Sequence, residues 1–386
     1  MNRSRFPGLA GGWARLDGPA GTQMVDVAID AMTGFMRSGA NANHGGMFAA
    51  ARETDAVIAA ARSAVGSLLD ADPEGVVFGP SMTALTFRFS AAVGRELGPG
   101  DEVVCTRLDH DANVRPWVIA CERAGAVVRF ADPLPGSLEL PAAAVEAVLS
   151  ERTRWVCVTA ASNACGTIPD LGGIVDAARE AGARVYLDAV HAAPHRPLSL
   201  REVGVDVIAC SAYKWFGPHV GILCAAPELL ASYDPDKLRP SSDEVPDRWE
   251  LGTLPFESLA GVTAAAEYVR DAGWDAVRSH EDGLLASALQ GLAGVDGVTL
   301  VGGASNRTPT IMFTLEGMAS RELAVELAAH EVAVWHGNYY AWELECHLGL
   351  APHGAVRAGF VHYNDASDAS RLVEAVASIA GARAAA

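Results

Sequence analysis

From Val76 onward the sequence alternates between two kinds of segment, and this narrows the choice of fold further than any other feature. Short runs rich in Val, Ile and Cys are separated by segments of helical period. Such alternation indicates strand–helix–strand units, because parallel neighbouring strands need long crossover connections. We therefore predict an α/β fold with one mostly parallel, seven-stranded sheet, made of Val76–Phe78, Glu102–Thr106, Val127–Phe130, Trp155–Thr159, Arg184–Leu187, Val207–Cys210 and Gly221–Cys224.

The pattern changes after about Phe256. We expect helices over Leu259–Ala272 and Val277–Leu292, strands at Thr310–Leu315, Val332–Trp335 and Ala355–His362, and a last helix with Ser367 as its N-cap. A chain of 386 residues is long enough for a large and a small domain. We predict an N-terminal segment (1–30) that packs with the small domain, a large domain (31–255) and a small α+β domain (256–386).

Charge and hydropathy restrict the partners. The formal charge of −18 repels phosphate backbones and acidic lipids, so we expect neither nucleic-acid nor membrane binding. No apolar run reaches the roughly 18 to 20 residues of a membrane span, and residues 1–18 lack the hydrophobic stretch of a signal peptide. These features predict a cytoplasmic protein.

The cysteines indicate neither disulfides nor a metal site. The seven are scattered and no CxxC pair occurs: Cys105, Cys121, Cys157, Cys165, Cys210, Cys224 and Cys346.

Lysine is almost absent from the chain. Of the 29 basic residues 27 are arginines, and the two lysines are Lys214 and Lys237. Lys237 lies in a polar stretch next to prolines, where a surface role suffices. Lys214 lies between aromatic residues in Ser211–Pro218, and only lysine offers an amine that can be desolvated and deprotonated there. We interpret Lys214 as a catalytic amine; the alternative is a stem packed on tryptophan with its head in water.

Four strand ends carry polar groups, and in open α/β sheets such ends gather at one edge. Gly79–Thr86 opens a helix and would cradle a phosphate with its free backbone amides, or would form an ordinary serine cap. Asp188 would pair with a protonated pyridine nitrogen, or would form a salt bridge or helix cap. Ser211 and Lys214 follow the next strand, and Asn163 would bond a ring hydroxyl or satisfy its own turn.

These residues resemble the class V aminotransferase family of fold-type-I pyridoxal-phosphate (PLP) enzymes, in its cysteine-desulfurase-like branch. The resemblance covers nearly the whole chain. Its most specific parts are Asp109–Asn113, Asp188–His191 and Ser211–Pro218.

The resemblance implies a role for each matching residue. Lys214 would hold PLP as a Schiff base, Asp188 would bond the pyridine nitrogen, and His110 would stack on the ring. His191 and Asn163 would bond the phenolic oxygen of the cofactor. The phosphate would be bound by Met82, Thr83 and Ser211, and by Thr253 across a homodimer interface. Arg357 would bind the substrate carboxylate, and the loop that contains Asn43 and His44 would gate the substrate. Structural histidines, and a surface salt bridge for Arg357, are the alternatives.

One stretch departs from the family pattern. Desulfurases carry a mobile cysteine where this chain has Trp335–Trp342, and tyrosine occupies that place. Cys346 lies six residues beyond Tyr340 in a helical stretch, where we expect a core residue. Tyr339 and Tyr340 would line the side-chain pocket or pack between the lobes.

We therefore expect a PLP-dependent lyase that cleaves the C–S bond of cysteine or an S-conjugated cysteine by β-elimination. The alternatives are a decarboxylating oxidative deaminase, an aminotransferase, an epimerase and a non-catalytic binding protein with this fold.

Overall fold

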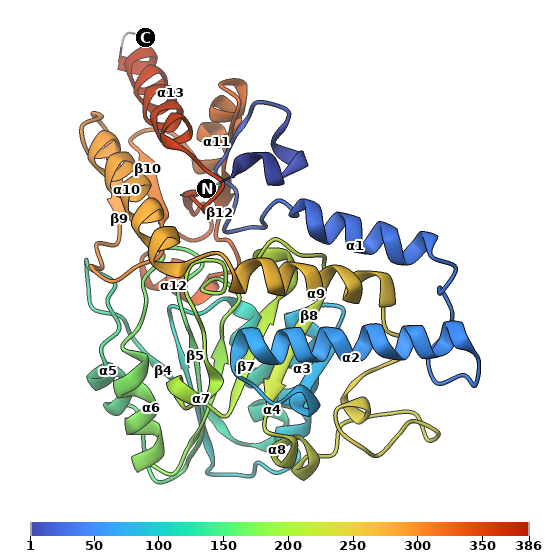
Figure 1. Cartoon of the computed structure of the whole chain (residues 1–386). Coiled ribbons are helices and arrows are strands. Elements are labelled where there is room, and N and C mark those ends of the chain that lie inside the picture. Colours follow the sequence, from blue (N-terminus) through green and yellow to red (C-terminus); the bar gives the residue numbers. More distant parts are fainter. Residues whose placement is uncertain (1, 385–386) are drawn as a thin grey trace.

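The computed structural model describes residues 2–384, and a seven-stranded sheet forms its centre (Figure 1). The strand order is β2 (Val76–Gly79), β8 (Gly221–Ala225), β7 (Val207–Ser211), β6 (Arg184–Asp188), β5 (Thr153–Thr159), β3 (Glu102–Thr106) and β4 (Val127–Ala131). β8 is antiparallel to both neighbours, and the other pairs are parallel. The predicted α/β class and all seven predicted strands are confirmed.

Both faces of this sheet are buried, which explains the continuous apolar runs of its strands. In β5, Trp155 and Cys157 belong to one hydrophobic core, whereas Val156 and Val158 belong to the other. This alternation follows from the two-residue period of a strand. The helices of this part are α2 (Ala49–Leu69), α3 (Met82–Val93), α4 (Arg115–Ala124), α5 (Ala142–Glu146), α6 (Leu171–Glu180), α7 (Leu200–Val203) and α8 (Pro227–Ser232).

A second, four-stranded antiparallel sheet forms the smaller lobe at the top of Figure 1. Its order is β12 (Trp335–Gly337), β13 (Ala355–Gly359), β10 (Thr310–Leu315) and β9 (Val298–Val301). The helices of this lobe are α10 (Trp274–Ala293), α11 (Ser320–Ala329), α12 (Trp342–His347) and α13 (Ala366–Ala384). The predicted strand Val332–Trp335 is wrong in extent, because β11 (Val332–Ala333) and β12 are separate strands in different sheets.

Helix α9 (Phe256–Arg270) packs lengthwise against α1 (Asp26–Arg37) and α2 (Figure 1). Its buried side chains, among them Leu259 and Val262, belong to the core of the large lobe. This packing favours a domain boundary after Arg270 over one before Phe256. We keep the three-part division as a proposal with that change.

The N-terminal segment contacts both lobes. β1 (Ala14–Arg15) pairs in parallel with β11 of the small lobe, whereas Phe6 packs in the core of the large lobe. Between these contacts, Thr22 bonds the backbone of Tyr213 and Phe216 on the loop that carries Lys214.

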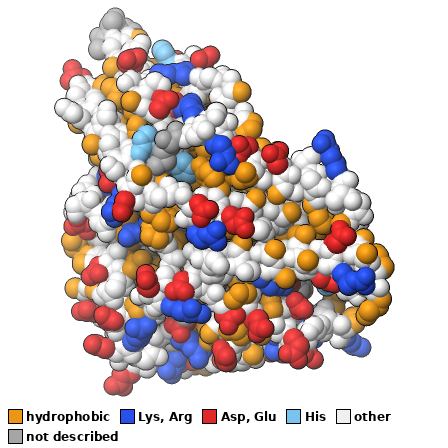
Figure 2. Space-filling view, viewed as in Figure 1, with side chains coloured by type: hydrophobic (Ala, Val, Ile, Leu, Met, Phe, Trp, Pro, Cys, Tyr) orange, Lys and Arg blue, Asp and Glu red, His pale blue; other side chains and the backbone are white. Residues whose placement is uncertain are grey.

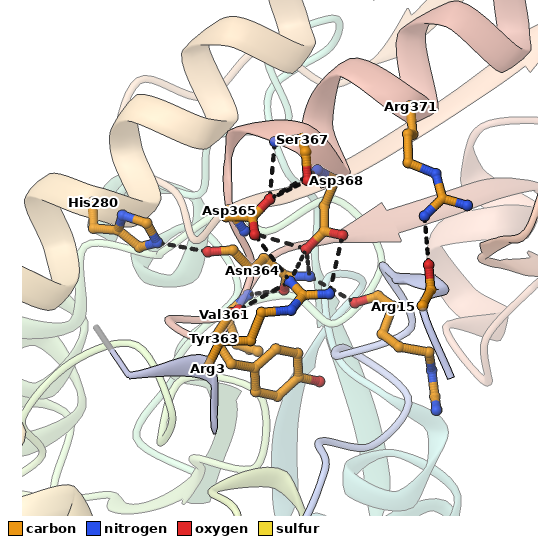
Figure 3. A network of polar contacts seen from close by, with 11 residues as sticks. Arg3, Arg15, His280, Val361, Tyr363, Asn364, Asp365, Ser367, Asp368 and Arg371 are labelled. Atoms are coloured by element: carbon orange, nitrogen blue, oxygen red, sulfur yellow. Dashed lines mark hydrogen bonds and ion pairs between the residues drawn. The ribbon is translucent and has the colours of Figure 1, made fainter. Parts of the chain in front are cut away.

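A polar network ties the N-terminal segment to the start of α13 (Figure 3). The Arg3 guanidinium contacts Asp368 at 2.6 Å, and the Asn364 amide donates to the Arg15 carbonyl at 3.0 Å. The Asp365 carboxylate accepts from the backbone amides of Ser367 and Asp368. Ser367 is therefore not the N-cap as predicted, because Asp365 bonds the free amides at this helix start and Ser367 lies inside the helix.

Within residues 2–384, none of the helices combines the length and the apolar character that a membrane span requires. On the face drawn in Figure 2, acidic and basic side chains are interspersed over the large lobe. All seven cysteines are free thiols; six are buried, and Cys346 is exposed, contrary to the core position predicted for it.

Candidate active site

The carboxyl ends of the central strands surround a narrow inner cavity of about 80 Å³. Its walls include eight of the predicted residues: Met82, Thr83, His110, Asn163, Asp188, His191, Ser211 and Lys214. Arg357 lines the connected outer cavity. They meet there because parallel strands end at the same edge of the sheet.

Lys214 is buried, and its amine lies where two stretches of chain converge. The short helical turn Ala212–Lys214 follows β7 directly and brings the side chain to the cavity. Nζ donates to the carbonyls of Pro19 at 2.5 Å and Ala20 at 2.9 Å. Burial, and next the nearby Arg357 guanidinium, lower the pKa of Lys214 to about 7, although Asp188 opposes the shift. The neutral form of the amine is therefore far more accessible near neutral pH than in an exposed lysine.

Asp188 ends β6 and is 3% exposed. Oδ1 accepts from the Val190 amide at 2.9 Å, so part of the carboxylate forms a local turn. Burial raises the pKa of Asp188 to about 6, and the charge of Lys214 partly offsets this. No salt bridge to Asp188 is present among the described residues, and one side of the carboxylate is left for a cationic partner.

The start of α3 is both an ordinary cap and an anion cradle. The Ser81 hydroxyl accepts from the Ala84 amide at 3.1 Å, which is the expected serine cap. The Ser211 hydroxyl accepts from the Met82 amide at 3.3 Å, and the Thr83 amide has no partner within the described part of the chain. The cradle lies at the positive end of the 12-residue helix.

Gly221 of β8 allows this cradle to form. A Cβ on Gly221 would lie 2.1 Å from the Ser81 carbonyl carbon and 2.5 Å from the Met82 amide nitrogen. A glycine is needed because the turn crosses β8 in backbone contact.

His110 and His191 are held by different partners. His110 caps its own turn, since Nδ1 accepts from the Ala112 amide at 3.0 Å, and its ring stacks on Tyr340 with centroids 5.4 Å apart. Burial, with Lys214 and Arg357 nearby, lowers the pKa of His110 to about 3. His191 lies within hydrogen-bond distance of the hydroxyls of Thr308 (3.1 Å) and Thr310 (2.9 Å). Burial also lowers the pKa of His191, so both imidazoles are neutral.

Asn163 and Arg357 join the two lobes. The Asn163 amide nitrogen donates to the Tyr339 carbonyl at 2.8 Å, and the Arg357 guanidinium donates to the Asn163 carbonyl at 2.7 Å. The Oδ1 atom of Asn163 is buried without a partner. Arg357 is 4% exposed and its guanidinium lies 4.5 Å over the Tyr339 ring. The surface salt bridge considered for Arg357 is therefore excluded; burial lowers its pKa to about 10.

Three predicted residues lie elsewhere in this chain. Thr253 is exposed after α8, and Asn43 and His44 lie on the exposed connection between α1 and α2. None of the three lines either cavity of the described chain.

Sequence reasoning did not find several residues that hold the site together. They are the carbonyls of Pro19 and Ala20, the hydroxyls of Thr308 and Thr310, and the buried Asp109, which bonds Thr106 and Asn113 beneath His110. The motif Asp109–Asn113 was the available signal for Asp109. Contacts through backbone carbonyls leave no signal in the sequence, because every residue has a carbonyl.

Known proteins resemble this chain over nearly its full length. A profile described as "Aminotransferase class-V" matches residues 14–372. "Uncharacterized protein MT3887" of Mycobacterium tuberculosis (strain CDC 1551 / Oshkosh) is 33% identical, covering 98% of each chain. "Probable cysteine desulfurase 1" of Mycobacterium leprae is 32% identical to this chain, and the matched region covers 94% of this chain and 61% of that protein.

Among solved structures, the cysteine desulfurase CsdA from Escherichia coli superposes with a TM-score of 0.87 at 27% identity, covering 98% of this chain and 97% of CsdA. A C-DES mutant with glycine covalently linked to its PLP cofactor has a TM-score of 0.84 at 20% identity, which shows the shared fold, with 98% and 99% coverage. From the profile match and these relatives, the chain belongs to the class-V aminotransferase family, in its cysteine-desulfurase-like branch, and is a PLP-dependent enzyme.

Proposed function

We propose that the protein is a C–S lyase, which cleaves cysteine or an S-conjugated cysteine by β-elimination to pyruvate, ammonia and a sulfur-containing product. The observation that carries this proposal is the buried amine of Lys214, which lies beside Arg357 and has a pKa of about 7. A group with that pKa can both accept and return a proton at neutral pH.

The inner cavity suits PLP. The α3 amides and the Ser211 hydroxyl form a seat for its phosphate, and Asp188 offers a carboxylate for its ring nitrogen. The unpartnered Oδ1 of Asn163 is a buried acceptor that needs a donor, and a ring hydroxyl would supply one. His110 and His191 would flank the ring, with His191 near its phenolic oxygen. When bound, PLP withdraws electrons from the substrate Cα.

Lys214 would move a proton in this reaction. Its free amine would remove the proton from the substrate Cα. The neutral amine is available because burial disfavours its charged form. Asp188, kept beside the ring by burial and the Val190 amide, would maintain the positive charge of the ring nitrogen.

Arg357 would hold the substrate carboxylate. Its guanidinium is buried, no carboxylate of the described chain forms an ion pair with it, and it lines the outer cavity next to Lys214. A planar guanidinium can bind a carboxylate through two parallel hydrogen bonds. The contacts with Asn163 and the Tyr339 ring fix its position before the substrate arrives.

The arrangement of the cavity wall favours release of the sulfur with the product over its transfer to the enzyme. The turn that faces the site presents Tyr339 and Tyr340. Cys346 is exposed on α12, and within the described residues it lines neither cavity.

We also propose a homodimer with shared active sites. In it, Thr253 of the partner subunit would reach the phosphate, and the loop with Asn43 and His44 would gate the substrate. The exposure of these three residues in the single chain is consistent with this arrangement.

The two lysines allow a matched test. Borohydride should fix the cofactor on the peptide that contains Lys214, and Lys214→Ala should abolish this and slow turnover by about 100-fold or more. Lys237→Ala is the control, because Lys237 lies outside both cavities and contacts Asp243 at 2.9 Å. A Lys214→Ala protein that turns over like the parent would contradict the assignment, and a purified protein that takes up no PLP would indicate a binding protein.

Product analysis tests the reaction itself. Pyruvate and a free thiol from S-substituted cysteines would support β-elimination. A keto acid formed only with an amino acceptor would indicate transamination, loss of carbon dioxide would indicate oxidative deamination, and racemisation alone would indicate an epimerase.

A further inference from the structure

The inner cavity opens into a much larger outer cavity. The outer cavity has a volume of about 900 Å³, against about 80 Å³ inside, and Lys214, His110, Asn163 and Thr83 line both. Cavities of about 300–1,000 Å³ typically enclose drug-sized ligands. The amino-acid part of a substrate needs only the end near Lys214 and Arg357, so most of the outer space is available to a group attached beyond the sulfur.

Aromatic side chains form the wall of that outer space. Tyr340 is 71% exposed, Trp335 52% and Phe87 42%, and all three line the cavity. They come from three separate places in the chain: a turn, β12 and α3. Large exposed apolar side chains gathered on one concave surface mark binding sites, and flat rings offer wide contact with little loss of rotational freedom.

The turn that carries Tyr340 is fixed in place. Tyr339 and Tyr340 both adopt the left-handed conformation, with φ of 51° and 59°, which non-glycine residues hold only where their surroundings enforce it. The large lobe supplies two of the restraints: the Asn163 amide donates to the Tyr339 carbonyl at 2.8 Å, and the Asp111 amide donates to the Tyr340 carbonyl at 2.6 Å. The Asn338 side chain accepts from the Tyr340 amide at 3.0 Å.

The two consecutive tyrosines serve different halves of the site. Tyr339 is 7% exposed and lies under the Arg357 guanidinium, on the carboxylate side. The Tyr340 ring lies on the outer side, stacked on His110 with an interplanar angle of 26°. The outer wall is therefore formed before a ligand binds, which lowers the entropic cost of binding.

We propose that this outer wall is a specificity subsite for a large aromatic group on the sulfur of a cysteine conjugate, with Trp335, Tyr340 and Phe87 as the residues that select it. The proposal rests on the proposed C–S lyase function and narrows its substrate class. Cysteine itself, and conjugates with a small group on the sulfur, would leave this wall in water.

Binding of unreactive analogues to the PLP-loaded enzyme tests the subsite directly. 3-(Benzylsulfanyl)propanoate and 3-(methylsulfanyl)propanoate keep the carboxylate and the sulfur but lack the amine that reacts with PLP. By calorimetry, the benzyl compound should bind about tenfold or more tightly, because it buries several more carbon atoms.

Variants assign the preference to the wall. Trp335→Ala and Tyr340→Ala should each reduce the difference in affinity between the benzyl and methyl compounds to about threefold or less. Tyr340→Phe should keep the full difference. Trp342→Ala is the matched control, since Trp342 is 46% exposed but lies outside the cavity lining. If an alanine variant fails to fold, the leucine variant at the same position replaces it, because leucine also lacks a flat ring.

Two outcomes separate the subsite from the reaction. Equal binding of the two analogues, no binding of the benzyl compound, or a preference unchanged in Trp335→Ala and Tyr340→Ala would overturn the subsite, while pyruvate from S-methylcysteine would still support the lyase. A benzyl preference lost in these variants, with no pyruvate from either S-benzylcysteine or S-methylcysteine, would uphold the subsite and overturn the lyase.

Discussion

At the scale of single residues, the proposed chemistry depends on one amine that the fold holds away from water. Arginine supplies 27 of the 29 positive side chains of this chain, and its guanidinium stays charged in proteins. Lysine is retained at position 214, where burial favours the neutral form. The carbonyls of Pro19 and Ala20 bond the amine and orient it toward the cavity wall.

This burial should cost stability in the absence of the cofactor. Burial lowers the folded-state pKa of Lys214 to about 7 from 10.5, so the unfolded chain binds more protons between these two values. The stability of the apoenzyme should therefore rise with pH from 7 to 10.5, and the destabilisation is full below pH 7. Lys214→Met, which removes the charge, should make the apoenzyme more stable than the parent at pH 7.

Urea unfolding of both apoproteins across this pH range checks the expectation. The difference in free energy of unfolding between the two proteins should close above pH 10.5, where lysine is neutral in the folded and the unfolded state. A variant that is less stable than the parent at pH 7, or a difference in stability that does not change with pH, would contradict the lowered pKa of the buried amine.

The sequence identifies residues whose chemistry is rare at their position. Lys214 and Asp188 follow apolar strands, and strand ends meet at one edge, so their convergence could be predicted. The bonds of Thr308 and Thr310 to His191 could not, because they cross between lobes about 117 residues apart along the chain. Thr253, Asn43 and His44 could be assigned only by family resemblance, and their roles stay predictions.

At the scale of elements, the contact between β8 and the start of α3 sets the position of the anion cradle. Gly221 lies under the Ser81–Met82 peptide, and no larger residue fits there without moving the turn. The same turn provides the free amides of α3, so the spacing of strand and helix fixes where an anion can bind.

Gly221→Ala should therefore weaken PLP binding by about tenfold or more, because steric overlap of this kind costs roughly 1–3 kcal/mol. Gly283→Ala is the control: Gly283 lies within α10 with open space at its Cβ position, and alanine there should stabilise the protein by about 0.5–1 kcal/mol. Fluorescence titration of the apoproteins with PLP measures the affinity. Unchanged affinity in Gly221→Ala would show that the cradle does not bind the phosphate.

Element prediction succeeded where periodicity is strong. The seven strands of the central sheet were found because most of them are buried on both faces and form apolar runs, and the edge strand β4, which is partly exposed, still carries Val127, Val128 and Phe130. β9 was missed, because it has only four residues, all of them partly or fully exposed. The split between β11 and β12 was also missed, since the change of sheet depends on the partner strands β1 and β13 and not on local sequence.

At the scale of the whole molecule, the network in Figure 3 holds the first residues of the chain against the last helix. The Asp368 side chain is 2% exposed and bonds both Arg3 and Asn364. Asp368→Ala should lower the free energy of unfolding by about 3 kcal/mol, because it leaves partly buried donors unpaired. Asp275→Ala, which breaks a fully solvated pair with Arg278, should cost less than about 0.5 kcal/mol. Denaturation midpoints of the two variants give the comparison; equal losses would show that the network adds little.

The exposed connection between α1 and α2 bears on the proposed dimer. Met47 is 93% exposed and Phe48 58%, and hydrophobic side chains are visible at this end of the molecule in Figure 2. Met47→Asp should shift the protein from dimer to monomer and reduce PLP-dependent turnover, although Met47 lies outside both cavities. Val325→Asp, at an apolar residue on α11 that is 61% exposed, should leave the dimer intact. Sedimentation equilibrium separates the cases, and a wild-type monomer would end the proposal.

The pairing of β1 with β11 has a mechanical consequence. Only four residues separate Arg15, which is tied to the small lobe, from Ala20, which is tied to the reactive amine. A connection of four residues can lengthen very little. Any displacement of the small lobe relative to the large one would therefore strain the bonds between these carbonyls and the lysine.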